Sequence, residues 1–572
     1  MQSGKKFTVT ILVPLLCLLT MMLAACGSQG GAPQGGSTAK APDDKQVLHY
    51  PVVGDISTLD PALVEDTDSN FPIQCIFTGL VTLDKGLNVV PQLAESYKPS
   101  ADGLTWTFHL KPNLKFSDGT ALTSNDVVYS INRAIDPATK STVSGYLSLV
   151  KDYAEFNAKK SVKTLIGDSL LAPDPATVVI KISKNAAYFL QTLTYPTSYV
   201  VNHTLVEKYG TKFTDHLDEG AGAGPFKVTQ GGYSHTTGIE LVPNDSYYSA
   251  KPALKKLSIS FFKDQGGMYK AYQANQLDFS PIPPANLDQE RNSQGFSQIP
   301  LLTIRYIAMN YLVKPFDNIK IRQAFALAIN KDVIAKNALN DAFTATNHFI
   351  PSGMPGYNQS LNAIDGTNKT AGDKDKAKQL LADGMKEAGY ADISALPPLN
   401  LTFYPRNQQF KDAVTIITQD WQQVLGLKVT VTIVDRAKLL TLTTASKNNP
   451  QGLQMWLAGW NADYPDEQDW LSTFFEKGAD YNQSNYGQNQ STTVTDQLAV
   501  QDKLLQADTT QDATARVKLY NDAEQQLEND VAWIPLWQES LQILVRPTVQ
   551  NLKPNAQQLI PPDDWSKIFV SQ

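Results

Sequence analysis

The sequence predicts an α/β fold in which strands and helices alternate along most of the chain. The clearest pattern is a strand-like apolar run at 399–405, an amphipathic helical pattern at 410–426, and a second strand-like run at 427–434. A strand, a helix and a strand in succession form a βαβ unit, whose two strands lie parallel in one sheet. Ligands of such sheets bind in crevices beyond the ends of the strands.

Further elements follow from local patterns along the chain. Thr123 stands three residues before Asp126, which is the spacing of a capping box, so a helix should begin there. Gly389 should end the helix predicted at 376–390, since glycine is common just after a helix. The remaining runs are strand-like at 47–53, 105–110, 177–182 and 532–538, and helical at 319–339 and 513–531.

The N-terminal 25 residues have the layout of a secretory signal peptide. Lys5 and Lys6 precede an apolar run that ends in "LAAC", and Pro14 disfavours a stable anchor helix. This ending resembles a bacterial lipobox, in which Cys26 is lipid-modified and becomes the first residue after removal of 1–25. An ordinary signal peptide that contains a cysteine is the alternative. Residues 26–45 are rich in Gly, Ser, Pro and Gln, and we expect a flexible tether.

Composition excludes several classes of function. The formal net charge is −7, and a negative chain is a poor partner for nucleic acid. Six scattered histidines form no HExxH motif and three cysteines form no CxxC motif, so a His/Cys metal enzyme is not expected. No G-x-S-x-G motif is present either, and the Gly-rich "GAGAGP" at 220–225 is interpreted as a turn. We expect no cofactor.

One stretch, "GWNADYPDEQDW" at 459–470, interleaves acidic and aromatic side chains. Its four carboxylates are Asp463, Asp466, Glu467 and Asp469. Carboxylates among large rings suit an acid/base pair, a metal site or a socket for a cationic ligand. The pattern by itself leaves these three alternatives open.

The stretch "VPQLAESYKPSADGLTWTFHLKPNLKFSDGTALTSNDVVYSINRAIDP" at 90–137 resembles the signature region of the oligopeptide- and dipeptide-binding family. These proteins, the bacterial extracellular solute-binding proteins of family 5, are solute receptors of ABC importers. Further matches follow in order, such as "STLDP" at 57–61, "GAGPFKV" at 222–228, "AGWNADY" at 458–464 and "YNDAEQQLENDVAWIPLW" at 520–537. The resemblance covers the chain after the tether and is strongest to the oligopeptide-binding members.

The resemblance implies an α/β fold of the type II periplasmic-binding-protein kind, in which two lobes close on a ligand as a venus flytrap does. Ligand lobe I would comprise 45–78, 221–303 and 535–572. An accessory domain II would occupy 79–220, and ligand lobe III would occupy 304–534. The two lobes would be joined by two crossings, near 304 and 534.

The resemblance also assigns roles within "AGWNADY". Asp463 would pair with the α-ammonium of a peptide, and Trp460 and Tyr464 would form apolar walls beside Asn461 and Ala462. A structural N-cap is the alternative for Asp463. For the three later carboxylates of the stretch, we expect a solvated first turn of a helix, which the helix dipole favours.

Two other segments carry expected ligand contacts. The acidic run "LVEDTDSN" matches the place where the family supplies an edge strand to the ligand, with Glu65, Asp66 and Thr67 as candidates, and a solvated loop is the alternative. Arg406 follows a strand end, where relatives bind a ligand carboxylate; a surface arginine is the alternative. Some oligopeptide receptors have an arginine before Ala-Gly-Trp, whereas Leu457 stands here, so a basic partner for the far end of the ligand is not assigned.

The sequence therefore predicts a lipid-anchored receptor on the extracytoplasmic face of a bacterial membrane. It would capture peptides and deliver them to a membrane-embedded ABC permease and its ATPase, as a monomer and without enzymatic activity. The same fold also serves other solutes, so an oligosaccharide, an opine-like conjugate or a metal chelate is an alternative ligand. A hydrolase that uses Asp463 and Asp466 as a carboxylate pair is a more remote alternative.

Overall fold

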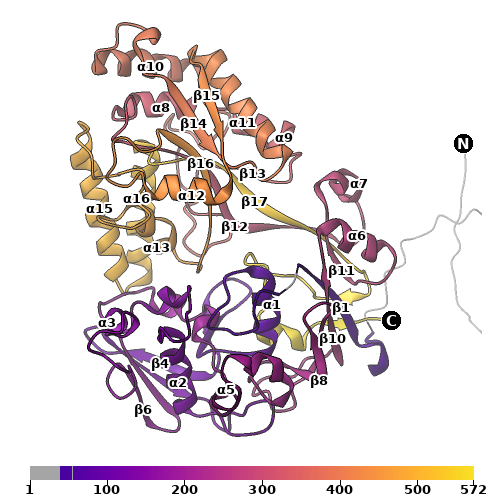
Figure 1. Cartoon of the computed structure of the whole chain (residues 1–572). Coiled ribbons are helices and arrows are strands. Elements are labelled where there is room, and N and C mark those ends of the chain that lie inside the picture. The colour runs from indigo at the N-terminus through magenta and orange to yellow at the C-terminus, as the bar shows by residue number, and fades with distance from the viewer. Residues whose placement is uncertain (1–38, 55) are drawn as a thin grey trace, which may run out of the picture.

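The computed structural model describes residues 39–54 and 56–572, and only the backbone of Thr67. Figure 1 shows an upper and a lower part, joined by the long strands β12 (Phe296–Met309) and β17 (Ile534–Val545). The two ends of the described chain meet, because the backbone N–H of Gln572 donates to the carbonyl of Ala39 at 2.9 Å. None of the helices in these residues is long and apolar enough to cross a membrane.

A seven-stranded sheet forms the centre of the upper part. Its order is β11-β17-β12-β16-β14-β15, and β13 pairs with β17. β14 lies parallel to β15 and to β16, and the helix α11 (Gln408–Asp420) connects β14 to β15, so the predicted βαβ unit is confirmed. The other bounds are β11 (Phe279–Pro281), β13 (Thr344–Ala345), β14 (Leu399–Phe403), β15 (Val429–Ile433) and β16 (Met455–Asn461).

The lower part contains two four-stranded sheets. One has the order β1-β10-β9-β8 and brings together segments from distant parts of the sequence: β1 (Val47–Val53), β8 (Phe226–Ser234), β9 (Gly238–Pro243) and β10 (Lys256–Phe262). The other is antiparallel with the order β4-β5-β7-β6: β4 (Ala94–Pro99), β5 (Thr105–Leu110), β6 (Leu170–Asp174) and β7 (Thr177–Lys181). Two further sheets have two short strands each. One pairs β2 (Val81–Leu83) with β3 (Val89–Pro91), and the other pairs β18 (Val549–Gln550) with β19 (Phe569–Val570).

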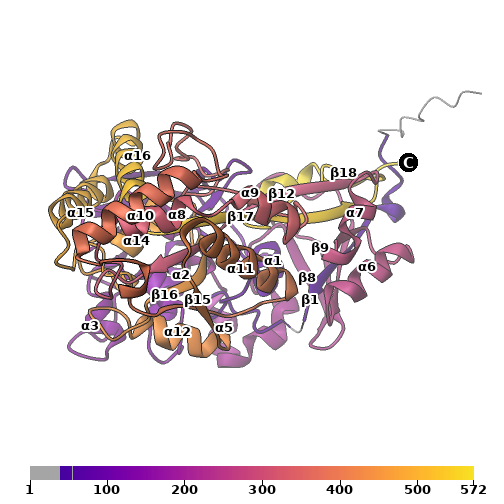
Figure 2. The same cartoon turned by 90° about the horizontal axis from the view of Figure 1, so that it is seen from above.

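The helices begin and end largely where their capping residues predict. α2 (Ser124–Ile135) begins at the capping box, in which the backbone N–H of Thr123 donates to Asp126 at 2.8 Å. α10 (Lys374–Ala388) ends at Gly389, whose φ of 78° is left-handed. The predicted helical region at 319–339 is two helices, α8 (Ile319–Leu327) and α9 (Lys331–Asn337), and α10 packs along α8 (Figure 2).

The other helices include a long pair, formed by residues 494–509 and 513–530, that flanks one side of the upper part. They are α1 (Thr67–Ile76), α3 (Tyr153–Asn157), α4 (Phe189–Thr192), α5 (His203–Tyr209), α6 (Gln265–Gln273), α7 (Leu287–Glu290), α12 (Arg436–Thr444), α13 (Glu467–Trp470), α14 (Ser472–Phe475), α15 (Val494–Thr509) and α16 (Ala513–Asp530).

The Gly-rich loop at 220–225 fixes the C-terminal end of α1. A Cβ atom on Gly222 would lie 2.3 Å from the carbonyl oxygen of Ile76, and one on Gly224 would lie 2.6 Å from its carbonyl carbon. Only glycine allows the two backbones to approach this closely. The loop therefore serves packing, in agreement with its interpretation as a turn, and it helps to hold α1 in place beside the cavity described below.

Separate hydrophobic cores lie under the sheets. One core joins the β1-β10 sheet to the C-terminal segment through side chains such as Leu48, Leu257 and Trp565. A second fills the β4-β7 sheet around Phe108 and Ile131. Two more lie on the seven-stranded sheet. The division into lobe I, domain II and lobe III, with its boundaries, stays a prediction.

Candidate functional site

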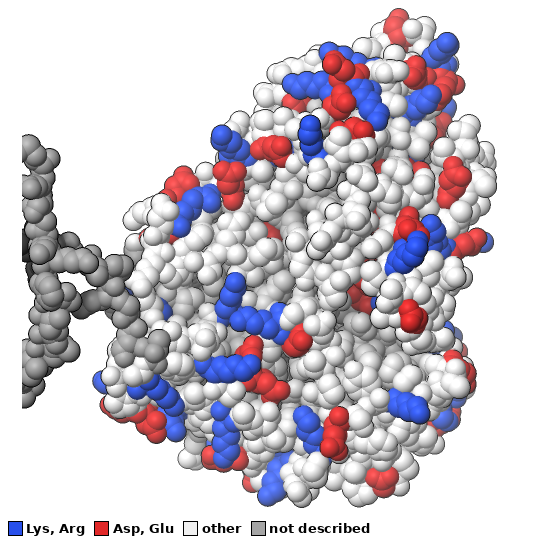
Figure 3. Space-filling view, turned by 180° about the vertical axis from the view of Figure 1, so that it is seen from behind, with Lys and Arg blue, Asp and Glu red and all other residues white. Residues whose placement is uncertain are grey.

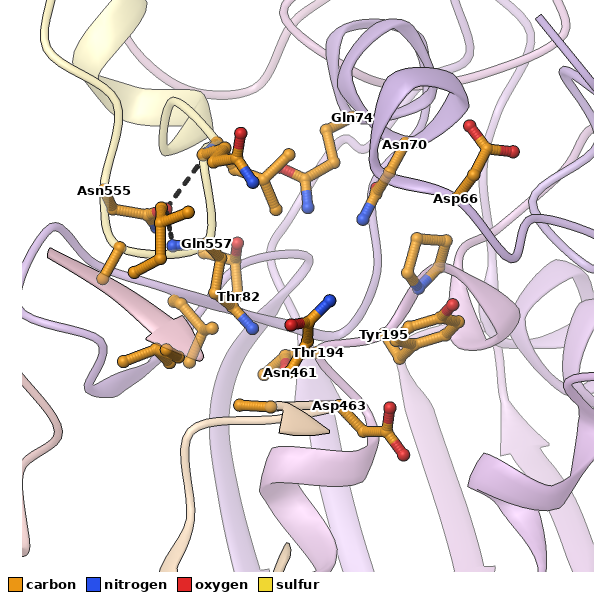
Figure 4. Close-up of a pocket in the computed structure, with 18 of the residues that line it drawn as sticks. Asp66, Asn70, Gln74, Thr82, Thr194, Tyr195, Asn461, Asp463, Asn555 and Gln557 are labelled. Carbon is orange, nitrogen blue, oxygen red and sulfur yellow. Dashed lines mark hydrogen bonds between the residues drawn. The ribbon is translucent and has the colours of Figure 1, made fainter. Parts of the chain in front are cut away.

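A cavity of about 220 Å³ lies between the upper and the lower part (Figure 4). The end of β16 contributes Asn461, Ala462 and Asp463, and α1 with the residues before it contributes Glu65, Asp66, Asn70 and Gln74. Strand β12 contributes Leu301 and Thr303, and other segments complete the lining with Tyr146, Thr194, Tyr195, Asn555, Gln557 and Gln558, among others. The lining contains three carboxylates and no Lys, Arg or His. Such a cavity suits a ligand with a positive group and several hydrogen-bonding groups.

The seven-stranded sheet places the end of β16 at this cavity. Thr303 of β12 pairs in register with Asn461, and its hydroxyl donates to the Asn461 side chain at 2.9 Å. Beyond the strand, the backbone N–H of Ala462 still donates to the carbonyl of Leu302 at 2.9 Å. Asp463 follows at the point where the chain leaves the sheet, which is where ligands of such sheets are expected.

Asp463 is mostly buried and has no cationic partner. Its carboxylate accepts a hydrogen bond from the hydroxyl of Tyr146, and no Lys, Arg or His in 39–54 or 56–572 forms an ion pair with it. Burial raises the pKa of Asp463 to about 6, although the bond from Tyr146 lowers it. The alternative that Asp463 is an N-cap is wrong, because Asp466 caps α13 through the backbone N–H of Gln468 at 2.9 Å.

The carboxylate of Asp469 lies directly behind Asp463. It is 2% exposed and accepts hydrogen bonds from the backbone N–H of Asp463 at 2.9 Å and from the indole of Trp460 at 3.0 Å. Burial, together with the nearby charge of Asp463, raises the pKa of Asp469 well above its usual range. Two carboxyl groups thus meet at the end of β16.

The expectation that the later carboxylates lie in a solvated helix turn is wrong. They do begin a helix, but Asp466, Glu467 and Asp469 are each at most 5% exposed. Arg516 of α16 donates to Asp466 at 2.5 and 2.9 Å and lies 3.5 Å from Glu467. Burial, with the charge of Asp466, raises the pKa of Glu467 to about 7. The acidic run is visible in the sequence, whereas the cation that compensates it lies about 50 residues further on.

Trp460 and Tyr464 lie outside the lining of the cavity. The Trp460 ring packs on Phe474, with ring centroids 5.0 Å apart. The Tyr464 ring belongs to the core of the β4-β7 sheet. Tyr146 and Tyr195 form the aromatic wall instead, stacked with centroids 3.8 Å apart. No motif around these two tyrosines marked them in the sequence.

The acidic run before α1 also reaches the cavity, but not as a strand. Residues 64–66 lie in a loop, and α1 begins at Thr67, whose side chain lies outside the described part of the structure. Asp66 caps α1 by accepting from the backbone N–H of Ser69 at 2.7 Å. Glu65 accepts a hydrogen bond from Thr142 of the lower part. Both carboxylates line the cavity, and their predicted contact with a ligand stays a prediction.

Arg406 does follow a strand end, as expected, since β14 ends at Phe403. Its Nη1 donates to Glu539 of β17 at 2.8 Å, and its guanidinium lies over the ring of Phe410. Its side chain is 47% exposed and does not line the cavity. A role for Arg406 in ligand binding therefore stays a prediction.

Comparison with known proteins supplies the family. The family model described as "Bacterial extracellular solute-binding proteins, family 5 Middle" matches residues 88–482, which is more than half of the chain. The chain belongs to this family. Family 5 proteins bind solutes, and the chain is a binding protein and not an enzyme, as predicted. The type II periplasmic-binding fold predicted from the resemblance is confirmed by the structural relatives described next.

Three curated relatives match along most of their length. The oligopeptide-binding protein OppA of Bacillus subtilis (strain 168) is 26% identical, over 85% of this chain and 89% of its own. The dipeptide-binding protein DppE of the same organism is 27% identical, over 91% and 92%. The glutathione-binding protein GsiB of Shigella flexneri is 29% identical, over 86% and 88%.

Solved structures share the fold of this family 5 protein. The periplasmic murein tripeptide-binding protein MppA in its unliganded open form gives a TM-score of 0.77, at 22% identity, over 94% of this chain and 99% of its own. Listeria monocytogenes OppA bound to peptide gives a TM-score of 0.64, at 23% identity, over 92% and 99%.

Proposed function

We propose that this family 5 protein is a lipid-anchored receptor on the extracytoplasmic face of a bacterial membrane. It captures peptides in the cavity between its two parts and delivers them to the permease and ATPase of an ABC importer. The names of the relatives support a peptide ligand, since the three curated ones bind oligopeptides, dipeptides and glutathione. We expect a monomer. Seen from behind, the surface mixes both signs of charge without an extended basic patch on that face (Figure 3), which fits a solute receptor.

The observation that carries this proposal is the charge of the cavity. Glu65, Asp66 and Asp463 line it, and no cation does. A buried carboxylate without a partner is costly, because desolvation disfavours its charged form. The α-ammonium of a peptide would supply the missing charge at Asp463, with a hydrogen bond as well. A neutral sugar would leave that charge uncompensated.

The edge of β16 supports an extended peptide. β16 pairs with β12 up to Asn461, but its pairing with β14 ends at Leu457. No strand in the described residues pairs with 458–461 on that second side. Backbone N–H and C=O groups along such an edge can bind the main chain of a peptide without reading its side chains, as in strand addition.

We propose further that the ligand closes lobe I on lobe III about the two crossings. Strands β12 and β17 contain the crossings, near 304 and 534. The TM-score of 0.77 to an unliganded open form, against 0.64 to a peptide-bound relative, agrees with an open arrangement of the lobes here. Closure excludes water and so strengthens a charge pair in the cavity. Small-angle scattering should show a smaller radius of gyration with saturating ligand, and an unchanged radius would contradict closure.

A binding scan tests the proposed function. Purified protein is titrated by calorimetry with peptides of two to six residues, with oligosaccharides and with metal chelates, and native mass spectrometry identifies any ligand that is purified with it. We expect free peptides to bind and N-acetylated peptides to bind at least about tenfold more weakly, since one charge-assisted contact is lost. Binding of a sugar or a chelate without binding of any peptide would refute the peptide ligand.

A further inference from the structure

A loop near the C-terminus, residues 555–559, forms one wall of the cavity. The side-chain oxygen of Asn555 fixes this loop by accepting from the backbone N–H groups of Gln557 and Leu559, at 2.9 and 3.1 Å (Figure 4). The backbone N–H of Asn555 donates to the carbonyl of Leu559 at 2.8 Å. Gln558 has a left-handed φ of 66°, which is costly for a residue with a side chain and persists only where the surroundings hold it. The loop is therefore shaped before a ligand arrives.

This loop presents two unpaired amide groups to the cavity. Gln557 and Gln558 both line it, and their side chains have no hydrogen-bond partner among the described residues. The carbonyl of Ala556 accepts from the backbone N–H of Leu302 in β12 at 3.3 Å, which holds the loop against the strand beside it. Each amide carries donors and an acceptor, so the wall suits a ligand group that offers both.

Helix α1 places another amide group at the cavity. The side chain of Asn70 points into the cavity, and its oxygen is buried without a partner (Figure 4). Gln74, one turn further along α1, also lines the cavity and makes a hydrogen bond with Tyr199. The amide side chains in the lining are Asn70, Gln74, Asn461, Asn555, Gln557 and Gln558.

The ends and the main chain of a peptide do not need these amide groups. In the proposed function, Asp463 binds the ammonium and the edge of β16 binds the main chain. Successive side chains of an extended peptide point to opposite sides, so the first two meet different walls of the cavity. An apolar side chain would displace water from the amide groups and leave them unpaired. A site built from hydrogen-bonding groups rejects a ligand that lacks the matching group much more strongly than an apolar pocket rejects one methylene.

We propose that Asn70 and Gln557 select peptides whose first two residues have amide or hydroxyl side chains, that is Asn, Gln, Ser or Thr. Amide side chains fit best, because one amide can donate to another and accept from it. This inference rests on the proposed function and adds the class of side chain that the receptor prefers.

The test compares Asn-Asn-Ala with Leu-Leu-Ala, whose first two side chains have nearly the same shape but no polar atoms. Both peptides, and trialanine as the reference, are titrated by calorimetry into the full chain. The parent should bind Asn-Asn-Ala about 10- to 100-fold more tightly than Leu-Leu-Ala. Asn70→Leu and Gln557→Met keep the size of each side chain and remove its amide, so each should reduce this ratio at least about threefold. Their affinity for trialanine should stay within about threefold of that of the parent. Gln289→Met, at an exposed position of α7, is the matched control and should keep the ratio of the parent.

The outcomes separate this inference from the proposed function. If trialanine binds but the parent binds Leu-Leu-Ala as tightly as Asn-Asn-Ala, the selection is refuted and the peptide receptor stands. If the parent prefers Asn-Asn-Ala and Gln557→Met keeps the full preference, Gln557 does not select the ligand. The Gln557→Met result decides this even where Asn70→Leu does not fold, because Gln557 lies in a loop outside the helices. If no peptide binds, the proposed function itself is refuted, and the inference with it.

Discussion

The backbone N–H of Asp463 donates to the buried carboxylate of Asp469 at 2.9 Å, so two carboxyl groups share the cavity end of β16. No cation in the described part of the chain pairs with either of them. Two adjacent carboxylates cannot both stay ionised at low cost, and a proton or an external cation relieves the repulsion. The pair therefore favours a ligand with an ammonium group and makes binding sensitive to pH.

Asp463→Asn should weaken the binding of free peptides strongly. Loss of one partner of a desolvated charge pair costs about 2–5 kcal/mol, which is roughly 30- to several-thousand-fold in affinity. Asparagine keeps the shape of the side chain but not the charge, so the preference for free over N-acetylated peptides should largely vanish. Calorimetry measures the affinity for free peptides and the preference over N-acetylated ones. Asp480→Asn, whose side chain is 99% exposed, is the control. If Asp463→Asn binds free peptides as tightly as the parent does, Asp463 does not bind their ammonium group.

The same substitution should stabilise the unliganded protein at neutral pH. Burial raises the pKa of Asp463 to about 6, above that of an unfolded aspartate, so the folded state binds more protons between about pH 4 and 6. Stability is therefore lost as the pH rises through this window, by at most about 3 kcal/mol. Asparagine does not ionise, so the unfolding temperature of Asp463→Asn should exceed that of the parent at pH 7.5. At pH 4 the unfolding temperatures of the two proteins should agree. An unfolding temperature of Asp463→Asn below that of the parent at pH 7.5 would refute this explanation.

Arg516→Met should destabilise the protein markedly. Arg516 compensates Asp466 in the interior, where the side chains are 10% and 1% exposed. Removal of one partner of such a buried pair costs about 3–5 kcal/mol. Urea unfolding followed by tryptophan fluorescence measures the loss. Lys518→Met, on the same helix with a side chain that is 74% exposed, should change stability by less than about 1 kcal/mol. Equal losses of stability in the two variants would show that the buried ion pair is not needed for stability.

Local sequence patterns were sufficient to predict many helices and strands. The errors of the prediction have physical causes. The capping box at Thr123, the stop at Gly389 and the βαβ unit depend on residues close in sequence, and each is confirmed. Asp463 lines the cavity, and its contact with a ligand, which the resemblance implies, stays a prediction. The burial of Asp466 was missed because its partner, Arg516, approaches only through tertiary packing.

The aromatic wall was missed for a related reason. Tyr146 lies in a short 3-10 helix (Ser144–Leu147) of the lower part and meets Asp463 of the upper part only when the two parts are placed against each other. Trp460, which stands in the motif itself, turns toward Phe474 instead. Alternation in a strand predicts which residues share a face, but not which of two apolar environments each side chain enters.

Cys26→Ser should release the protein from the membrane or leave its N-terminus uncleaved. Cys26 lies outside the described residues, and the prediction rests on "LAAC" after an apolar run. Stable anchoring needs two or more acyl chains, which a diacylglyceryl cysteine supplies. Fractionation followed by intact-mass analysis measures both location and modification. Cys75→Ser, a buried thiol far from this motif, is the control and should stay with the membrane. An unmodified Cys26 in the processed protein would contradict the anchor.

Peptide affinity should be highest between about pH 6 and 8. An ammonium ligand needs Asp463 ionised, and burial raises the pKa of Asp463 to about 6 in the unliganded protein. Below that value the ligand must displace a proton, so affinity should fall by up to about tenfold per pH unit. Above about pH 8 the α-amino group of the peptide loses its own proton, and affinity should fall again.

Calorimetry from pH 4.5 to 9, in buffers of different ionisation enthalpy, reports both the affinity and the protons released. On the acidic side, binding to the parent should release up to one proton. Asp463→Asn should bind weakly throughout and lose the acidic decline, but keep the alkaline one, because the latter belongs to the peptide. An affinity that stays constant from pH 5 to pH 7 in the parent would mean that Asp463 is already ionised without ligand. Its burial beside Asp469 would then not govern binding.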